Sequence, residues 1–177
     1  APDSSTETFA AMRIMIDNWR WEGVPFYLRT GKRMPKDVWE IAIQTKRPPL
    51  GQFYGSANTL VFNIVPEEGI SLSFQARIPG GRMKLGNVDM SFRYTDYFKK
   101  IQATGYERLV YSAMRGNSLL FRRSDMVETS WKIVQPIQDI WASERPESFP
   151  NYAAGSWGPD EADHLLKRDG REWRKIL

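Results

Sequence analysis

The sequence contains no cysteine, a single histidine and no long apolar run, and each absence excludes a class of protein. Without cysteine the chain has no disulfide scaffold, no zinc finger and no thiol nucleophile. One histidine and no cysteine cluster predict that the chain holds no transition metal. No stretch approaches the roughly 18 consecutive apolar residues of a membrane span, and no signal-peptide hydrophobic region is visible. We therefore expect no membrane association.

Motifs of common catalytic sites are also missing. The sequence has no G-x-G-x-x-G, no Walker loop and no G-x-S-x-G. His164 lies in PDEADHLLKRD, where we expect an exposed helix, so it is interpreted as a surface residue. Glu67 and Glu68 fall in a predicted loop. The residues alone therefore indicate no catalytic group in this chain.

The length of 177 residues and the 41% of hydrophobic residues are sufficient for one core. We expect a single domain, or at most two small ones. The chain begins at Ala1 with a polar stretch and without an initiator methionine. This beginning is more typical of a processed or excised fragment than of a natural N-terminus.

The net charge is +4 and the pI is about 9.4, which raises the possibility of nucleic-acid binding. The basic residues are mostly interleaved with acidic ones, however, which argues against a nucleic-acid partner. One stretch stands out, because residues 29–36, RTGKRMPK, carry four basic residues and no acidic one. This stretch is either a solvated turn or an anion site, most simply for a phosphate.

Residues 9 to 94 are dominated by patterns typical of strands. Strict alternation of apolar and polar residues predicts strands over residues 39–43, 70–78 and 88–94. The segment PEEG between residues 60–65 and 70–78 predicts a hairpin loop. Residues 9–17 and 25–29 are further candidate strands, with a helix as an open alternative for the first. Short links between strands favour antiparallel pairing.

From about residue 105 the periodicity becomes helical. Residues 106–114 share one helical face, and Gly116 or Asn117 can end that helix. Ser124 is a plausible N-cap of a second helix, which Pro136 should kink or split. Pro159 should begin a short third helix. The pattern predicts an α+β fold, a large, mainly antiparallel sheet with helices packed on one face. The other face is polar, so it is either wet or covered by a second polypeptide.

Four collinear blocks resemble the C-terminal domain of the glucose-6-phosphate dehydrogenase family. The first is DNWRWEGVPFYLRTGKRM at residues 17–34, and the second is the hairpin sequence VPEEGISLSF. The third is YERLVYSAMRGNSLLFRRSDMVETSWKIVQPI, and the fourth is YAAGSWGPDEAD at residues 152–163. Together they cover nearly all of the chain, far more than one short motif.

The resemblance implies a function. Intact members oxidise D-glucose 6-phosphate to 6-phosphogluconolactone and reduce NADP, in the cytoplasm and at the start of the oxidative pentose phosphate pathway. Their N-terminal Rossmann domain carries the glycine-rich loop and the catalytic histidine, and neither segment is in this sequence. Residues 1–177 therefore look like the substrate-side and dimerisation domain of a homodimer or homotetramer. Such a domain is expected to be inactive alone.

The resemblance also assigns substrate contacts. Lys32 occupies the position of the family lysine that contacts the sugar substrate. Gly31 lets the backbone approach a ligand, and the ammonium offers three donors. Five positions later the family has a second basic residue, but here that position is Asp37. A one-residue shift would let Lys36 serve instead, whereas the carboxylate of Asp37 would repel a phosphate.

Some members bind a second, structural NADP on this domain, and Arg29 matches one of its ligands. Other positions do not match, because residues without positive charge replace the family's lysine, arginine or glutamine at Val38, Ala42, Asn63, Val65 and Ser73. We therefore expect the structural NADP site to be absent. Trp19 and Trp21 are interpreted as core or interface anchors.

Two other functions compete with this interpretation. A non-catalytic paralogue or stand-alone interaction module with the same fold would explain the departures at the ligand positions. A basic nucleic-acid binder is the weaker alternative, and it predicts salt-dependent affinity for DNA or RNA.

Overall fold

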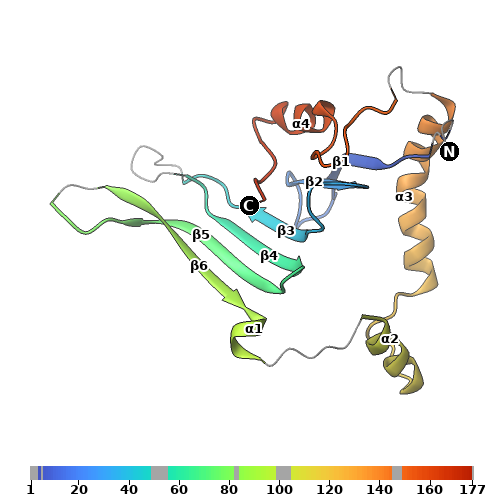
Figure 1. Cartoon of the computed structure of the whole chain (residues 1–177), viewed down its shortest axis with the longest axis horizontal. Helices are drawn as coiled ribbons and strands as arrows, with labels where there is room; N and C mark the ends of the chain where they lie inside the picture. Colours follow the sequence, from blue (N-terminus) through green and yellow to red (C-terminus); the bar gives the residue numbers. More distant parts are fainter. Residues whose placement is uncertain are drawn as a thin grey trace. The chain divides into compact units, whose positions relative to one another are not determined.

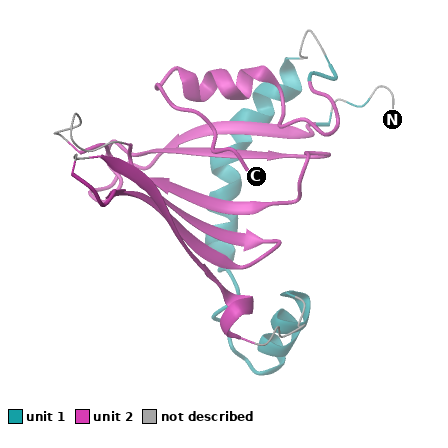
Figure 2. Cartoon of the chain, turned by 60° about the vertical axis from the view of Figure 1, so that its left-hand side comes forward, with its two compact units in different colours: residues 1–6, 100–151 teal, residues 7–99, 152–177 magenta. Residues whose placement is uncertain are grey.

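The computed structural model describes residues 4, 6–48, 56–81, 84–98, 105–144 and 149–176. Within these ranges the chain forms strands and helices in the following order (Figure 1): β1 (Phe9–Met15), β2 (Pro25–Gly31), β3 (Trp39–Gln44), β4 (Thr59–Val65), β5 (Gly69–Arg77), β6 (Leu85–Arg93), α1 (Tyr94–Tyr97), α2 (Gly105–Met114), α3 (Ser124–Ser143) and α4 (Asp160–Lys167). The contacts divide the chain into two compact units (Figure 2). One consists of residues 7–99 and 152–177, and the other of residues 1–6 and 100–151.

β1 and β2 form an antiparallel hairpin that pairs from Phe9 with Gly31 to Met15 with Pro25. Residues 9–15 are thus a strand, and the helical alternative for this segment is wrong. The turn between the strands is built on Asn18, whose side-chain oxygen accepts the amide protons of Arg20 at 3.1 Å and Trp21 at 2.9 Å. This arrangement is typical of asparagine in turns.

The two tryptophans of this turn have different environments. The ring of Trp21 meets that of Phe26 edge to face at a centroid distance of 5.2 Å. Trp19 is 85% exposed, so it is not a core residue. Of the two roles expected for Trp19, only that of an interface anchor stays open.

The other four strands form one antiparallel sheet in the order β3-β4-β5-β6. The predicted β4–β5 hairpin is confirmed, and its register pairs Asn63 with Gly69. The predicted polar face is also confirmed, because Ser73 lies opposite Asp89 and donates a hydrogen bond of 2.5 Å to its carboxylate. Antiparallel pairing throughout the described strands agrees with the expected fold class.

The end of β6 differs from the prediction. The alternation over residues 88–94 predicted a strand through Tyr94, but Tyr94 begins the short helix α1. Phe92 and Tyr94, two aromatic residues of the alternating pattern, pack their rings against each other instead. Phe92 meets Tyr94 edge to face at 5.0 Å and stacks on Tyr97 at 5.1 Å. Contacts between these aromatic side chains stabilise the turn of helix that sequence alternation could not reveal.

The helices of the other unit confirm the predicted positions with two corrections. α2 ends before Gly116, which has a φ of 64°, as expected for a helix stop. Ser124 is the first helical residue and not the N-cap, which is Arg123. Its neighbour Asp125 forms an ion pair of 2.8 Å with the guanidinium of Arg123 and places a negative charge in the first turn, where the helix dipole favours it.

Pro136 does not split α3, which is continuous from Ser124 to Ser143. A proline inside a helix removes one backbone hydrogen bond at a cost of about 3 kcal/mol. Twelve helical residues precede Pro136 and seven follow it, and the hydrogen bonds of these flanks keep the helix continuous. Of the two predicted effects of Pro136, the split is wrong, and the kink stays a prediction.

In the unit that contains the sheets, α4 packs on β1. Its inner face carries Ala162 and Leu166, each only 4% exposed, at the i, i+4 spacing of one helical stripe. The indole nitrogen of Trp173 donates a hydrogen bond of 2.9 Å to the carbonyl oxygen of Ala162. Pro159 precedes α4 as predicted. The fold is therefore α+β with antiparallel sheets, and none of its described helices is long and apolar enough to cross a membrane.

Candidate functional site

The loop that follows β2 carries the basic residues singled out in the sequence. β2 ends at Gly31, and the amide of Lys32 donates a hydrogen bond of 2.8 Å to the carbonyl oxygen of Thr8. The side chains of Lys32, Arg33 and Lys36 are exposed, and no described residue pairs with their charges. Three unneutralised cations on one short loop attract an anion.

Asp37 lies on the same exposed loop, just before β3. Its carboxylate has no ion-pair partner among the described residues. Lys32, Lys36 and Asp37 thus lie on one exposed loop, and their role as substrate contacts stays a prediction. The negative charge of Asp37 reduces the positive potential that the neighbouring lysines create.

Arg29 differs from these exposed residues because its side chain is partly buried. Its guanidinium lies 4.5 Å from the ring centre of Trp173 and 5.0 Å from that of Trp157. Burial against the two indoles lowers the pKa of Arg29, while the carboxylates of Asp163 and Glu40 oppose this shift. Cation–π contacts of this kind bind the guanidinium within the chain. Three of the four basic residues of the stretch are thus exposed, whereas Arg29 is partly buried against the two indoles.

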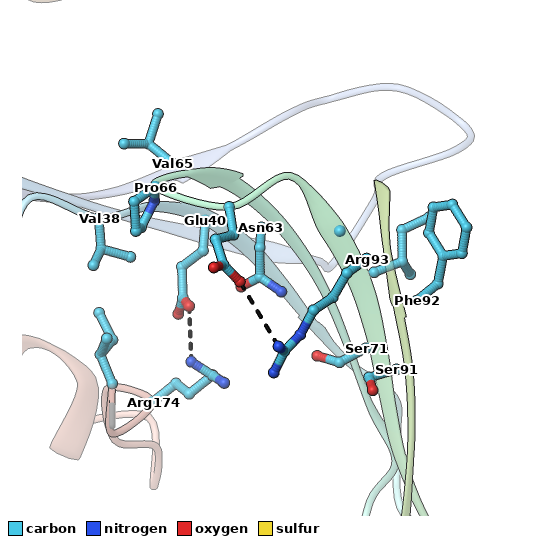
Figure 3. Close-up of a pocket in the computed structure, with 14 residues that line it drawn as sticks. Val38, Glu40, Asn63, Val65, Pro66, Ser71, Ser91, Phe92, Arg93 and Arg174 are labelled. Carbon is cyan, nitrogen blue, oxygen red and sulfur yellow. Dashed lines mark hydrogen bonds and ion pairs between the residues drawn. The ribbon is translucent and has the colours of Figure 1, made fainter. Parts of the chain in front are cut away.

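A pocket of about 390 Å³ opens on the polar face of the four-stranded sheet, beside the C-terminal segment (Figure 3). Glu40 holds Arg174 at 2.7 Å, and Glu67 lies 4.0 Å from Arg93. Both arginines of the pocket therefore face a carboxylate. Its lining includes three positions where the resemblance leads one to expect a cationic or amide ligand: Val38, Asn63 and Val65.

A second polar cluster, which sequence reasoning missed, joins the C-terminal segment to the β1–β2 hairpin. The hydroxyl of Tyr27 donates a hydrogen bond to Asp169, and the Nε of Arg13 lies 3.2 Å from the same carboxylate. Partial burial, together with the neighbouring negative charge of Asp169, raises the pKa of Tyr27. No sequence signal pointed to this cluster, because Tyr27 and Asp169 are 142 residues apart.

Sequence reasoning also missed Tyr152. Its hydroxyl lies 2.9 Å from the carbonyl oxygen of Thr8 and 3.0 Å from that of Lys32. The only signal was that Tyr152 begins the fourth block of resemblance, which says nothing about its contacts. The structure thus connects this block to the basic loop.

The described residues carry little acid–base or metal chemistry. His164 is exposed on α4, as expected. No group of three or more histidine, aspartate or glutamate side chains in the described ranges could hold a metal ion. The arrangement can therefore bind an anion on the Lys32 loop, and the one histidine of the sequence lies on α4 rather than on that loop.

The chain is similar to known proteins over almost its whole length. The family profile described as "Glucose-6-phosphate dehydrogenase, C-terminal domain" matches residues 1–174. The chain is 46% identical over 176 residues to the glucose-6-phosphate 1-dehydrogenase of Aggregatibacter actinomycetemcomitans and 41% identical over 181 residues to that of Chlamydia trachomatis. Each match covers 98% of this chain, but only 35% and 41% of the respective relatives.

Solved structures agree with the sequence comparison. The chain resembles the crystal structure of glucose-6-phosphate 1-dehydrogenase from Mycobacterium avium with a TM-score of 0.80 and 35% identity, over 100% of this chain and 37% of that one. It resembles a glucose-6-phosphate dehydrogenase in complex with its substrate glucose-6-phosphate with a TM-score of 0.85 and 31% identity, over 99% of this chain and 37% of that one.

The chain spans between 35% and 41% of the length of these curated relatives, so it corresponds to one part of them. The matched part is the C-terminal domain, which agrees with the four blocks found in the sequence and with the antiparallel α+β fold. By sequence and by fold, this chain belongs to the glucose-6-phosphate dehydrogenase family, as its C-terminal domain.

Proposed function

We propose that residues 1–177 form the substrate-side and dimerisation domain of a glucose-6-phosphate 1-dehydrogenase. The intact protein oxidises D-glucose 6-phosphate to 6-phosphogluconolactone and reduces NADP, as a cytoplasmic enzyme of glucose metabolism in the oxidative pentose phosphate pathway. In this proposal Lys32 contacts the sugar phosphate. The observation that carries the proposal is the exposed Lys32 loop, within a chain that matches this family along its length.

The chemistry of the loop fits a sugar phosphate. An ammonium group at Lys32 can donate to a phosphate or hydroxyl oxygen, and Arg33 and Lys36 add positive charge nearby. Lys36 is the candidate for a second substrate contact, because Asp37 occupies the position that is basic in the family. The relative in complex with glucose-6-phosphate supports the choice of ligand class.

The described residues do not fit a nicotinamide dinucleotide. The sequence has no G-x-G-x-x-G loop, so the main NADP site would lie in an N-terminal Rossmann domain outside this chain. The one matching ligand of the structural NADP, Arg29, makes cation–π contacts with Trp157 and Trp173. The arginines of the pocket face Glu40 and Glu67. We propose that the structural NADP site is absent.

We also propose that the intact protein is a homodimer or homotetramer. The polar face of the four-stranded sheet has a continuous row of side chains that can form hydrogen bonds, including Ser71, Ser73 and Ser91. A two-fold contact buries the same patch on both copies and is the commonest symmetric arrangement. Sedimentation of the intact protein at micromolar concentration tests this point, and a purely monomeric profile contradicts it.

The experiment that tests the proposed function follows NADPH formation by the intact protein that contains residues 1–177. Saturable reduction of NADP with glucose 6-phosphate, and little with unphosphorylated glucose, is the expected result. If neither sugar supports NADP reduction but the protein binds a partner through this domain, the alternative of a non-catalytic interaction module replaces the proposal. Salt-sensitive binding of RNA or DNA would point to the nucleic-acid alternative.

A further inference from the structure

We propose that residues 152–158, which we call the Tyr152 segment, fix the backbone of the Lys32 loop and so hold the Lys32 ammonium in position for the substrate. The inference deepens the proposed function and rests on it, because it takes Lys32 as a substrate contact. In this proposal Tyr152 is a positioning residue that acts through Lys32. Four contacts carry the argument, and they join segments separated by more than 100 residues in the sequence.

The first contact is the hydroxyl of Tyr152. Its oxygen lies 2.9 Å from the carbonyl oxygen of Thr8 and 3.0 Å from that of Lys32, and its single proton is shared between these two acceptors. The hydroxyl of Thr8, at 3.2 Å, can donate to the phenolic oxygen in return. Because the amide of Lys32 donates to the carbonyl of Thr8 at 2.8 Å, both backbone groups of Lys32 are hydrogen-bonded.

The second contact holds the next residue of the loop. Arg33 has a φ of 52°, a left-handed conformation that is strained for a residue with a Cβ. Such a conformation persists only where the surroundings determine it. The amide of Gly155 donates a hydrogen bond of 2.8 Å to the carbonyl oxygen of Arg33. The Tyr152 segment thus stabilises the backbone of Arg33 directly.

The third and fourth contacts are made by the ring of Phe9, which joins the segment to the end of β2. The ring of Tyr152 lies against it at a centroid distance of 5.5 Å. A Cβ placed on Gly158 would come within 2.3 Å of the Phe9 ring, and one on Gly31 within 2.7 Å. Phe9 is therefore packed closely against glycines on both sides, and neither side tolerates a larger residue without displacing the ring.

The cationic side chains of the loop do not help to fix its conformation. The side chains of Lys32, Arg33 and Lys36 are exposed and have no described partner. A lysine that starts from a mobile backbone loses more conformational freedom on binding than one that starts from a fixed backbone. Fixing the backbone beforehand lowers that cost, which is why the Tyr152 segment should matter for substrate affinity.

The first test is the steady-state kinetics of Tyr152→Phe in the intact protein. The phenylalanine keeps the ring against Phe9 and removes only the hydroxyl. We expect the KM for glucose 6-phosphate to rise about fivefold, the factor that corresponds to the net contribution of one ordinary hydrogen bond. The matched control is Tyr27→Phe, which removes the hydroxyl bound to Asp169 in the same unit and should leave KM unchanged. An equal KM change in both variants overturns the proposal.

The second test separates positioning from general loss of stability. If Tyr152 acts through Lys32, then Tyr152→Phe should change kcat/KM by less than about twofold in a protein that already carries Lys32→Ala. If the hydroxyl only stabilises the fold, the two effects add and kcat/KM falls by the same factor in both backgrounds. Additive effects overturn the proposal.

The third test does not depend on activity. Hydrogen exchange of the Lys32 amide reports its bond to Thr8, and we expect about fivefold faster exchange in Tyr152→Phe than in the unchanged protein or in Tyr27→Phe. Equal exchange in all three proteins overturns the proposal. If the unchanged protein reduces no NADP with glucose 6-phosphate, the proposed function fails, and the exchange rates still decide whether the Tyr152 segment holds the loop.

Discussion

The guanidinium of Arg29 lies 4.5 Å from the ring centre of Trp173, a residue close to the opposite end of the chain. Trp157 lies 5.0 Å from the same guanidinium. The contact connects β2 to the C-terminal segment, which Trp173 also anchors to α4 through its bond to Ala162. Arg29 therefore stabilises the packing of the C-terminal segment, and the role in nucleotide binding that the resemblance suggested stays a prediction.

We predict that Arg29→Gln lowers the free energy of unfolding by about 1–2 kcal/mol, the range of cation–π contacts that are partly shielded from water. Urea denaturation of the intact protein measures the effect. The matched control is Arg20→Gln, because Arg20 lies 5.0 Å from the ring centre of the exposed Trp19. The control should have a much smaller effect, and equal losses in the two variants would contradict a structural role for Arg29.

The raised pKa of Tyr27 predicts a dependence of stability on pH. The folded protein keeps the phenolic proton at pH values where the unfolded chain has begun to lose it, above the ordinary pKa of about 10. The stabilisation is fully present below that pH and is lost as the pH rises through the raised pKa. Denaturation midpoints measured on the alkaline side should fall more steeply for the unchanged protein than for Tyr27→Phe. Parallel curves would show that Tyr27 does not contribute.

Much of the fold could be predicted from the sequence, because it depends on local patterns. The alternation of apolar and polar residues predicted β3, β5 and β6, and the segment PEEG predicted the β4–β5 hairpin. The errors occurred where local rules competed with other interactions. Tyr94 continues the alternation but packs into α1, and Pro136 lies in a helix long enough to tolerate it.

The candidate site was less predictable, because its contacts join distant segments. The sequence revealed the basic stretch around Lys32, and the resemblance gave that stretch a role. Neither could show that Arg29 faces two indoles or that Tyr152 binds the backbone of Lys32, since these partners lie more than 100 residues away. Charge clusters can be read from a sequence, whereas the side chains that hold them in place require the structure.

Asp37 provides a test of the charge balance on the loop. We predict that Asp37→Lys lowers the KM for glucose 6-phosphate, or at least does not raise it, because the substitution removes a negative charge near the phosphate and adds a positive one. Asp37→Asn, which only removes the charge, should have a smaller effect in the same direction. The kinetics of the intact protein at low salt measure both variants. A higher KM in Asp37→Lys would show that the carboxylate assists binding.

The isolated chain of residues 1–177 should not reduce NADP. Its sole histidine is exposed on α4, and a general base alone contributes about 10²–10⁴-fold to such reactions. Hydride transfer also requires a bound and oriented cofactor, for which the sequence has no glycine-rich loop. An assay of NADPH formation with glucose 6-phosphate measures this directly. Saturable activity of the purified fragment would refute the division of roles that we propose.

The central claim is that the Lys32 loop binds the phosphorylated substrate, and the most direct measurement is kcat/KM of the intact protein with Lys32→Ala. A charge-assisted hydrogen bond contributes about 1.5–3 kcal/mol, so we predict a loss of about ten- to a hundredfold with the fold preserved. Lys36→Ala should give a smaller loss if it serves in place of Asp37, and Lys132→Ala on the exposed surface of α3 should give none. If Lys32→Ala instead keeps kcat/KM within about twofold of the unchanged protein, the lysine is a solvated surface residue and the anion site on this loop does not exist.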